Sequence, residues 1–186
     1  MMKRILLTLV FIGLLIQPAF ALEVAGVQLP EKVEIGGQQL QLNGYGIRKK
    51  FFFKIYVGSL YTAQKATTTA QVIDGTGGKL LRMNFLYSKV EKEKIVGGFA
   101  EGIEKNSPEL IKDPAVIQFL GLFDADFVKK DQVDLAITAD NQVIVSHNGR
   151  QLGTIQSANL AKAILLIYIG KEPADEDMKD GMLGKY

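Results

Sequence analysis

Cysteine and tryptophan are absent from this chain of 186 residues, and His147 is its only histidine. Without cysteine no disulfide can form, so packing of the core has to stabilise the fold. Cysteine and histidine are also the common zinc ligands, and no glycine-rich phosphate loop is present. We therefore expect neither a metal site nor a cofactor. His147 precedes the turn signal Asn148-Gly149, where a solvated or capping residue is expected.

An excess of one charge is also lacking. The formal net charge is +2, and Lys3 and Arg4 at the N-terminus account for it, because the rest of the chain carries 20 basic and 20 acidic side chains. Proteins that bind nucleic acid usually carry a basic face, and polybasic segments bind anionic lipids. This balance favours neither kind of partner.

The N-terminal residues have the pattern of a secretory leader. Lys3 and Arg4 precede an apolar run over residues 5–16, and residues 19–21 (Ala-Phe-Ala) have the small-x-small form of a signal peptidase site. The run is too short to span a bilayer comfortably. We expect residues 1–21 to be removed between Ala21 and Leu22. Residues 22–186 would then be a single periplasmic or secreted domain with no stable membrane anchor.

Alternating apolar and polar residues, broken by turn signals such as Gly36-Gly37 and Asp140-Asn141, predict antiparallel hairpins. An aromatic and β-branched stretch over residues 45–61 indicates one long strand or two linked strands. The other predicted strands cover residues 33–35, 39–42, 79–87, 133–138, 142–146 and 151–155.

Capping residues predict helices between and after these strands. Thr67 to Thr69 can cap a short helix that runs up to Asp74 and is stopped by Gly75, and Ser88 with Glu91 has the spacing of a capping box. Prolines and a serine mark three further helix starts, at Pro108, Pro114 and Ser157, and a last helix runs from Ala174 to Gly181. Strands segregated from helices indicate an α+β domain whose antiparallel sheet has helices on one face.

The helix after Ser88 has an apolar stripe that includes Phe99 and Ile103. Gly97, Gly98 and Gly102 lie on or beside this stripe, although glycine lowers helix propensity by about 1 kcal/mol relative to alanine. A glycine there allows either close packing of another element or close approach of a ligand.

Arg48 and Tyr56 are the candidate binding residues in the aromatic stretch. Strand alternation places Arg48, Phe52, Tyr56 and Leu60 on one face. A cation and a phenol among aromatic side chains suit an anionic oxygen in an apolar pocket. Because eight residues of straight strand span roughly 26 Å, the two side chains meet only if a bulge or bend intervenes near Lys49-Lys50. The alternative is a surface arginine and a core tyrosine.

Several dispersed segments resemble the chalcone isomerase-like family, and more closely its exported bacterial branch. They are the Gly-x-Arg of residues 46–48, the aromatic run of residues 52–61, Leu-Gly-Thr-Ile at 152–155 and the run from Ala163 to Pro173. The resemblance extends from about Val27 to Gly184. It implies an open-faced β-sandwich, in which a large antiparallel sheet carries helices packed on one face and a ligand cleft lies between them.

The resemblance transfers only part of the isomerase active site. The family arginine matches Arg48, and the threonine of the next strand matches Tyr56. The catalytic tyrosine falls near Glu91, with Tyr87 as the nearest substitute, and the asparagine and late threonine fall near Gly98 and Ile167. Without these polar groups little remains to stabilise an enolate.

In the non-catalytic branch of the family, an arginine and a tyrosine hold the carboxylate of a fatty acid, and Arg48 and Tyr56 resemble that pair. The leading hypothesis is therefore a non-catalytic protein that binds a fatty acid or similar amphipathic carboxylate. The predicted ligand-binding residues are Arg48, Tyr56, Phe52, Tyr87, Phe99 and Ile103. Two alternatives stay open. One is an isomerase or intramolecular lyase acting on an enone. The other is a structural or partner-binding envelope protein whose cleft is closed by Phe99 and the phenylalanines of residues 51–53.

Overall fold

The computed structural model describes residues 21–185. The expected leader therefore lies outside the described residues, apart from Ala21, which begins the first strand. Within residues 21–185, no helix combines the length and the apolar character that a membrane span requires.

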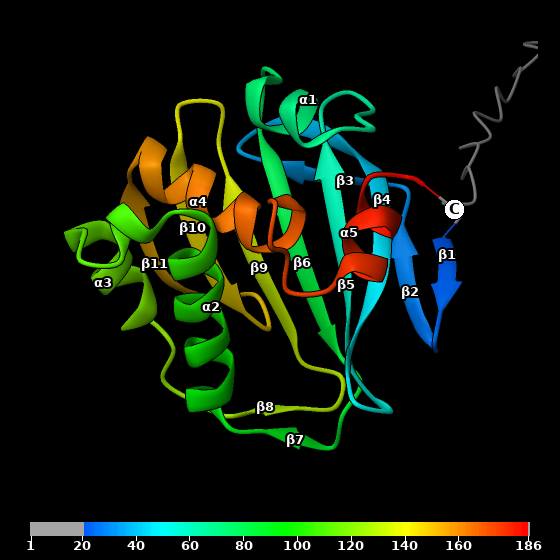
Figure 1. Ribbon diagram of the computed structural model, residues 1–186. Coiled ribbons are helices and arrows are strands. Elements are labelled where there is room, and N and C mark those ends of the chain that lie inside the picture. The colour runs from blue at the N-terminus through cyan, green and yellow to red at the C-terminus, as the bar shows by residue number, and fades with distance from the viewer. Residues whose placement is uncertain (1–20, 186) are drawn as a thin grey trace, which may run out of the picture.

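A curled antiparallel sheet of seven strands forms the centre of the molecule (Figure 1), in the order β11-β10-β9-β6-β5-β4-β3. Its strands are β3 (Lys32–Ile35), β4 (Gln38–Lys50), β5 (Phe53–Thr62), β6 (Lys79–Phe85), β9 (Gln132–Ile137), β10 (Gln142–His147) and β11 (Arg150–Gln156). Two separate pairs are β1 (Ala21–Val24) with β2 (Val27–Pro30), and β7 (Lys89–Val90) with β8 (Phe127–Val128).

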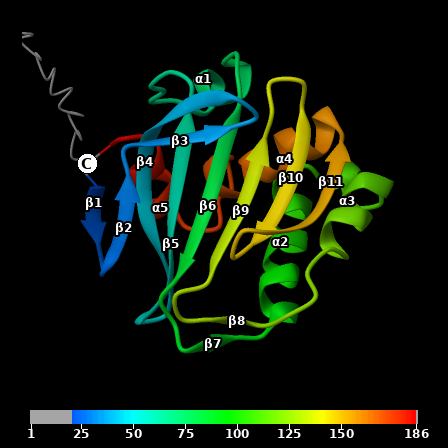
Figure 2. The same cartoon turned by 180° about the vertical axis from the view of Figure 1, so that it is seen from behind.

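The helices lie mainly on one face of this sheet, as the front and back views show (Figures 1 and 2). They are α1 (Thr69–Asp74), α2 (Lys92–Asn106), the 3-10 turn η1 (Pro108–Leu110), α3 (Pro114–Leu120), α4 (Ala158–Ile169) and α5 (Glu176–Met182). The predicted α+β class, with an antiparallel sheet and helices on one face, is confirmed.

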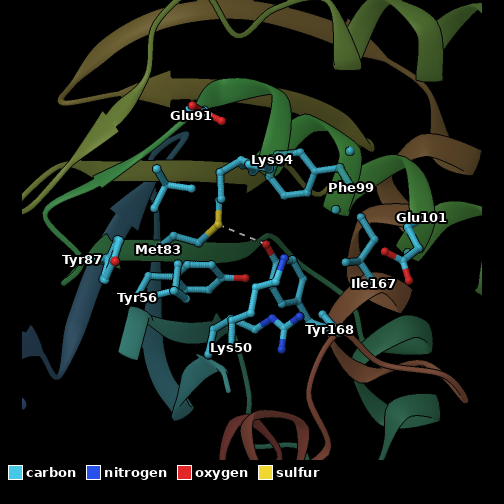
Figure 3. Close-up of a pocket in the computed structure, with 18 of the residues that line it drawn as sticks. Lys50, Tyr56, Met83, Tyr87, Glu91, Lys94, Phe99, Glu101, Ile167 and Tyr168 are labelled. Carbon is cyan, nitrogen blue, oxygen red and sulfur yellow. Dashed lines mark hydrogen bonds between the residues drawn. The ribbon is translucent and has the colours of Figure 1, made fainter. Parts of the chain in front are cut away.

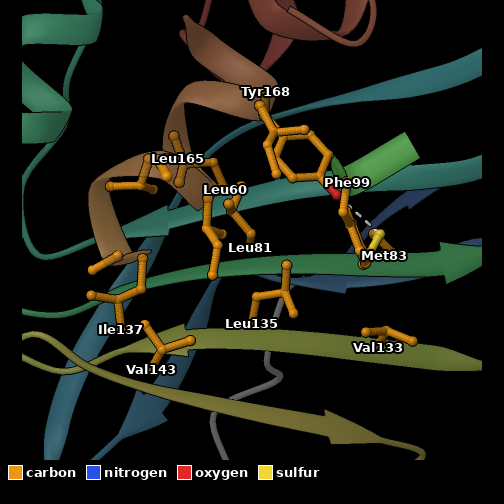
Figure 4. Packing of buried hydrophobic residues seen from close by; sticks show 14 of the residues in the cluster. Leu60, Leu81, Met83, Phe99, Val133, Leu135, Ile137, Val143, Leu165 and Tyr168 are labelled. Atoms are coloured by element: carbon orange, nitrogen blue, oxygen red, sulfur yellow. Dashed lines mark hydrogen bonds between the residues drawn. The ribbon is translucent and has the colours of Figure 1, made fainter. Parts of the chain in front are cut away.

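The main core lies between the sheet and these helices (Figure 4). Leu60, Leu81 and Leu135 point from neighbouring strands towards Leu165 of α4, and all four are buried. A smaller cluster around Leu40, Tyr61 and Leu80 occupies the opposite face, where the β3–β4 hairpin covers it. Apolar residues on both faces explain why the central strands are so rich in hydrophobic side chains.

The aromatic stretch forms two strands joined by a tight turn. Strands β4 and β5 are antiparallel, and the chain reverses at Phe51 and Phe52. The alternation expected to continue through Phe52 is therefore wrong, because this residue lies in the turn and not in a strand. Its side chain is 86% exposed.

Three glycines let α5 pack directly against the sheet. A Cβ on Gly44 would overlap the Gly181 carbonyl of α5, and a Cβ on Gly46 would overlap the Met178 backbone. A Cβ on Gly181 would in turn meet the Tyr45 carbonyl. The small residues thus bring the start of α5, at Asp175, close to the end of β4.

The capping box expected at Ser88 and Glu91 is wrong. Helix α2 begins at Lys92, and Glu91 at its N-cap makes no side-chain capping bond. Residues 89–90 instead pair with β8, and this pairing brings in Asp126, whose carboxylate accepts a hydrogen bond from the Lys92 amide at 3.0 Å. A residue distant in sequence supplies the cap.

The sequence predicts a solvated or capping residue at His147, and the structure shows that this side chain is not solvated. It ends β10, its side chain is only 10% exposed, and its Nε2 lies 2.9 Å from the Asp131 carboxylate. The turn that follows has positive φ at both Asn148 (51°) and Gly149 (76°), as a type I′ turn requires.

Candidate ligand-binding site

Arg48 and Tyr56 are direct partners across the β4–β5 pair. Side chains opposite each other on antiparallel strands lie on the same face, with Cβ atoms about 5 Å apart. A register shift between Arg48 and Lys49 marks an irregularity at the point where a bend was required. The tight turn, more than the bulge, brings the two residues together.

Asp175 holds the Arg48 side chain. The Arg48 Nη1 donates to the Lys49 carbonyl at 2.8 Å and to the Asp175 carboxylate at 3.4 Å. Asp175 also accepts from the backbone amides of Lys49 and Met178, and the latter bond caps α5. Within the described part of the chain both hydrogen bonds of Arg48 use Nη1. The Nε and Nη2 donors therefore remain for a ligand.

Tyr56 and Tyr168 form a buried polar pair inside the apolar wall. Burial raises the pKa of Tyr56 to about 12, although Arg48 and a hydrogen bond with Tyr168 act in the opposite direction. Burial also raises the pKa of Tyr168 well above its usual value. The Tyr168 hydroxyl donates to the Met83 sulfur at 3.1 Å (Figure 3). Both phenols therefore stay neutral at physiological pH.

A cavity of about 780 Å³ opens beside these residues, between the β4–β5 hairpin and helix α2. This volume lies within the range of about 300–1,000 Å³ that is typical of small-molecule sites. Figure 3 shows Tyr56, Met83 and Tyr168 on one side of it and Phe99 and Lys94 of α2 on the other. Its deep wall is apolar, and its rim carries charged side chains.

The rim of the cavity carries side chains of both positive and negative charge. Both lysines and glutamates line it, and Lys105 pairs with Glu101 at 2.6 Å. The remaining charged rim residues are Lys50, Lys89, Glu91, Glu93, Lys94 and Glu172. An amphipathic molecule could place its chain against the apolar wall and its charged group beside Arg48.

The sequence left two roles open for the glycines of α2, which are close helix packing and close approach of a ligand, and the structure shows that these glycines do not all have the same surroundings. A Cβ on Gly102 would press against Ile167 of α4, so this glycine permits close helix packing. Gly97 and Gly98 have no heavy atom within 4 Å of such a Cβ, and both line the cavity. Their missing side chains leave space at the cavity wall.

Of the six predicted ligand-binding residues, four line the cavity: Arg48, Tyr56, Tyr87 and Phe99. Phe52 does not, because it lies in the exposed turn with its ring 4.9 Å from that of Phe53. Ile103 is fully buried in the core, one turn of α2 beyond Phe99.

Sequence reasoning missed Tyr168, Met83 and Asp175. Tyr168 lies among the apolar residues of α4, and its polar hydroxyl in that setting is the available signal. Asp175 begins a short helix, where an N-cap role is the ordinary interpretation. Its second role beside Arg48 follows only from the packing of α5.

The resemblance places three further isomerase polar groups near Glu91, Gly98 and Ile167, and these three residues line the cavity. Gly98 and Ile167 offer no side-chain donor. Beside the apolar wall, Arg48 and the two buried phenols can polarise a ligand oxygen, and the rim adds lysines such as Lys50 and Lys94. The site is suited to hold an anion and less suited to stabilise an enolate.

This fold and site define an α+β protein with a ligand-sized cleft between an antiparallel sheet and its covering helices. The model of the chalcone isomerase-like family matches residues 21–184. The chain therefore belongs to the chalcone isomerase-like family.

A crystal structure of a fatty-acid binding protein from Arabidopsis thaliana is similar to this chain, with a TM-score of 0.66 and 18% sequence identity. The match covers 86% of this chain and 92% of the other. At this identity the similarity establishes the fold. A search of curated protein sequences found no match.

Proposed function

We propose that this protein is exported and binds a fatty acid or similar amphipathic carboxylate in the cavity beside Arg48. The pairing of Arg48 with Tyr56 at the side of an apolar cavity carries this proposal. A charged donor beside a neutral phenol can hold a carboxylate, because charge-assisted hydrogen bonds are stronger than neutral ones. The similar Arabidopsis structure is a fatty-acid binding protein by name, which supports the same ligand class.

The open cavity favours ligand binding over a closed cleft. Phe51 and Phe52 are 84% and 86% exposed, so they do not fill the space as a closed cleft requires. The residues at the isomerase positions argue against an enzyme, because Gly98 and Ile167 cannot organise a water at a ketone. The isomerase alternative predicts that the protein converts a chalcone faster than the background rate. This conversion is measured alongside ligand binding.

Calorimetric titration with dodecanoate and with dodecanol tests the proposal, because the two probes differ in the carboxylate. We expect Arg48→Ala to weaken dodecanoate binding about tenfold to a hundredfold, as expected for a lost charge-assisted hydrogen bond, and to leave dodecanol binding nearly unchanged. Arg150→Ala is the matched control, since Arg150 pairs with Asp124 on the surface. Equal dodecanoate affinity in the wild type and Arg48→Ala would contradict the proposal.

Export is tested separately. Mass spectrometry of the protein from an expressing bacterium gives its N-terminus, and fractionation gives its compartment. A protein that begins at Leu22 in the periplasm or medium supports export. An intact N-terminus in the cytoplasm contradicts export without bearing on the ligand.

A further inference from the structure

The turn between β4 and β5 exposes three consecutive phenylalanines. Phe51 and Phe52 are 84% and 86% exposed, and Phe53 is 45% exposed. We call residues 49–54, Lys-Lys-Phe-Phe-Phe-Lys, the aromatic tip. Exposed aromatic clusters of this kind are rare on soluble proteins and mark interaction sites.

One residue of the aromatic tip has a backbone conformation that is unfavourable for its side chain. Phe51 has a φ of 56°, in the left-handed region where glycine and asparagine are favoured and a bulky side chain is a genuine outlier. Glycine or asparagine here would satisfy the turn and remove the exposed ring. Conformations of this kind cluster at functional sites.

Lysines surround the exposed rings. Lys49, Lys50 and Lys54 are exposed, and Lys49 reaches the Asp177 carboxylate at 3.7 Å. Among the described residues no ion pair within 4.0 Å involves Lys50 or Lys54. The whole chain is nearly neutral and its overall charge predicted no attraction to lipid, but three of the six residues of this tip are lysines and none is acidic.

A second basic turn lies at the same end of the molecule. The β8–β9 turn carries exposed Lys129 and Lys130 and follows Val128, which is 45% exposed. Both views place this turn beside the β4–β5 turn (Figures 1 and 2). Within this turn Asp131 is only 9% exposed, and its carboxylate accepts hydrogen bonds from the Val128 amide and the Asn148 side chain. Nearby, Asp126 is paired with Lys89 at 2.9 Å, whereas Glu91 lies exposed on the cavity rim.

We propose that this end of the protein docks reversibly on a bilayer that contains anionic phospholipid, with Phe51 and Phe52 inserted among the headgroups. The flanking lysines supply the charge complementarity, since their aliphatic stems can lie along the apolar layer while the ammonium groups meet lipid phosphates. Lys50, Phe51 and Phe53 also line the cavity, so docking places its mouth at the lipid surface. Docking extends the proposed ligand binding and does not depend on it.

Because the chain has no tryptophan, one introduced tryptophan would report by its fluorescence on its own surroundings alone. A Phe52→Trp variant carries a single tryptophan at the aromatic tip and keeps an aromatic side chain there. The protein is produced from the full chain, and its N-terminus is read by mass spectrometry. With vesicles of phosphatidylcholine and phosphatidylglycerol in equal parts, we expect a blue shift of the emission and quenching by brominated lipid. Vesicles of phosphatidylcholine alone and high salt should both reduce the shift.

Vesicle co-sedimentation of substituted proteins measures how much the exposed rings and the lysines each contribute to vesicle binding. Phe51→Ser with Phe52→Ser should weaken binding on the order of tenfold for each ring. Lys50→Gln with Lys54→Gln should weaken it about fivefold for each charge. The controls are Ile117→Ser, which removes a 59% exposed side chain on α3, and Lys162→Gln on α4, and neither should change binding.

Any of three results would overturn the proposal. The first is an unshifted Phe52→Trp emission with anionic vesicles, and the second is vesicle binding that the tip substitutions leave unchanged. The third is an emission shift that depends on protein concentration without lipid and coincides with dimer formation in sedimentation, which would assign the aromatic tip to a second copy of the chain. Dodecanoate binding is measured on the same variants, so that loss of docking and loss of the cavity ligand are distinguished.

Discussion

Arg48 and Tyr56 face each other across two neighbouring strands, and the Asp175 carboxylate holds the arginine at 3.4 Å. The carboxylate that orients Arg48 is therefore also its competitor for any anionic ligand. Because the Asp175 side chain is only 14% exposed, its charge is poorly screened by water. The affinity of the site for an anion should depend on this balance.

Asp175→Asn should raise the affinity for dodecanoate several-fold. The substitution removes the competing charge, and asparagine is as good an N-cap as aspartate, so α5 should keep its start. Calorimetric titration gives the affinity, and urea unfolding checks stability. Asp177→Asn is the control, since this exposed carboxylate pairs with Lys49 and not with Arg48. A fall in affinity would mean that Asp175 serves mainly to position Arg48.

Gly46→Ala should destabilise the protein by about 1–3 kcal/mol, the usual cost of overpacking. A Cβ at this position would overlap the Met178 backbone and push α5 away from β4. Gly97→Ala, where the added methyl meets open space, should stabilise α2 by about 0.4–1 kcal/mol. Urea unfolding of both variants measures the contrast. Equal effects would show that α5 does not pack closely on the sheet.

The start of α2 offers a direct comparison of two capping residues. Asp126→Ala should cost about 0.5–2 kcal/mol of unfolding free energy, because the Lys92 amide loses its acceptor. Ser88→Ala should stay within about 0.5 kcal/mol of the wild type, as exposed substitutions usually do. Thermal unfolding distinguishes the two variants. A large effect at Ser88 and none at Asp126 would restore the capping box that the sequence predicted.

Tyrosine ionisation should couple to stability only at high pH. Burial raises the pKa of Tyr56 to about 12 and also raises the pKa values of Tyr61 and Tyr168. A folded pKa above the unfolded value means that the stabilisation is complete below about pH 10 and is lost as the pH rises towards 12.

We therefore expect three of the six tyrosines to ionise late in an ultraviolet titration, with unfolding free energy constant from neutral pH to about pH 10 and falling above it. Tyr56→Phe should remove one late-ionising group and make the alkaline fall less steep. Ionisation of all tyrosines near pH 10 in the folded protein would contradict the burial of these phenols.

Much of the fold could be predicted because its signals are local. Hairpin turns such as Asn148-Gly149, the Ser157 cap and the proline helix starts depend on a few neighbouring residues. The Ser88 capping box failed because the two residues between Ser88 and Glu91 form strand β7, which pairs with the distant strand β8. The Asp126 carboxylate, which is distant in sequence, then accepts the hydrogen bond from the helix start in place of the predicted local cap at Ser88.

The sequence alone determined the α+β class, the antiparallel hairpins and the chemical character of Arg48 and Tyr56, since propensity, periodicity and side-chain chemistry are carried by each residue and its near neighbours. Only the tertiary structure decided that a turn at Phe51 and Phe52 makes the two residues strand partners, and that glycine contacts bring Asp175 against Arg48. Those relationships join segments far apart along the chain. Their geometry depends on how whole elements pack, which no local pattern specifies.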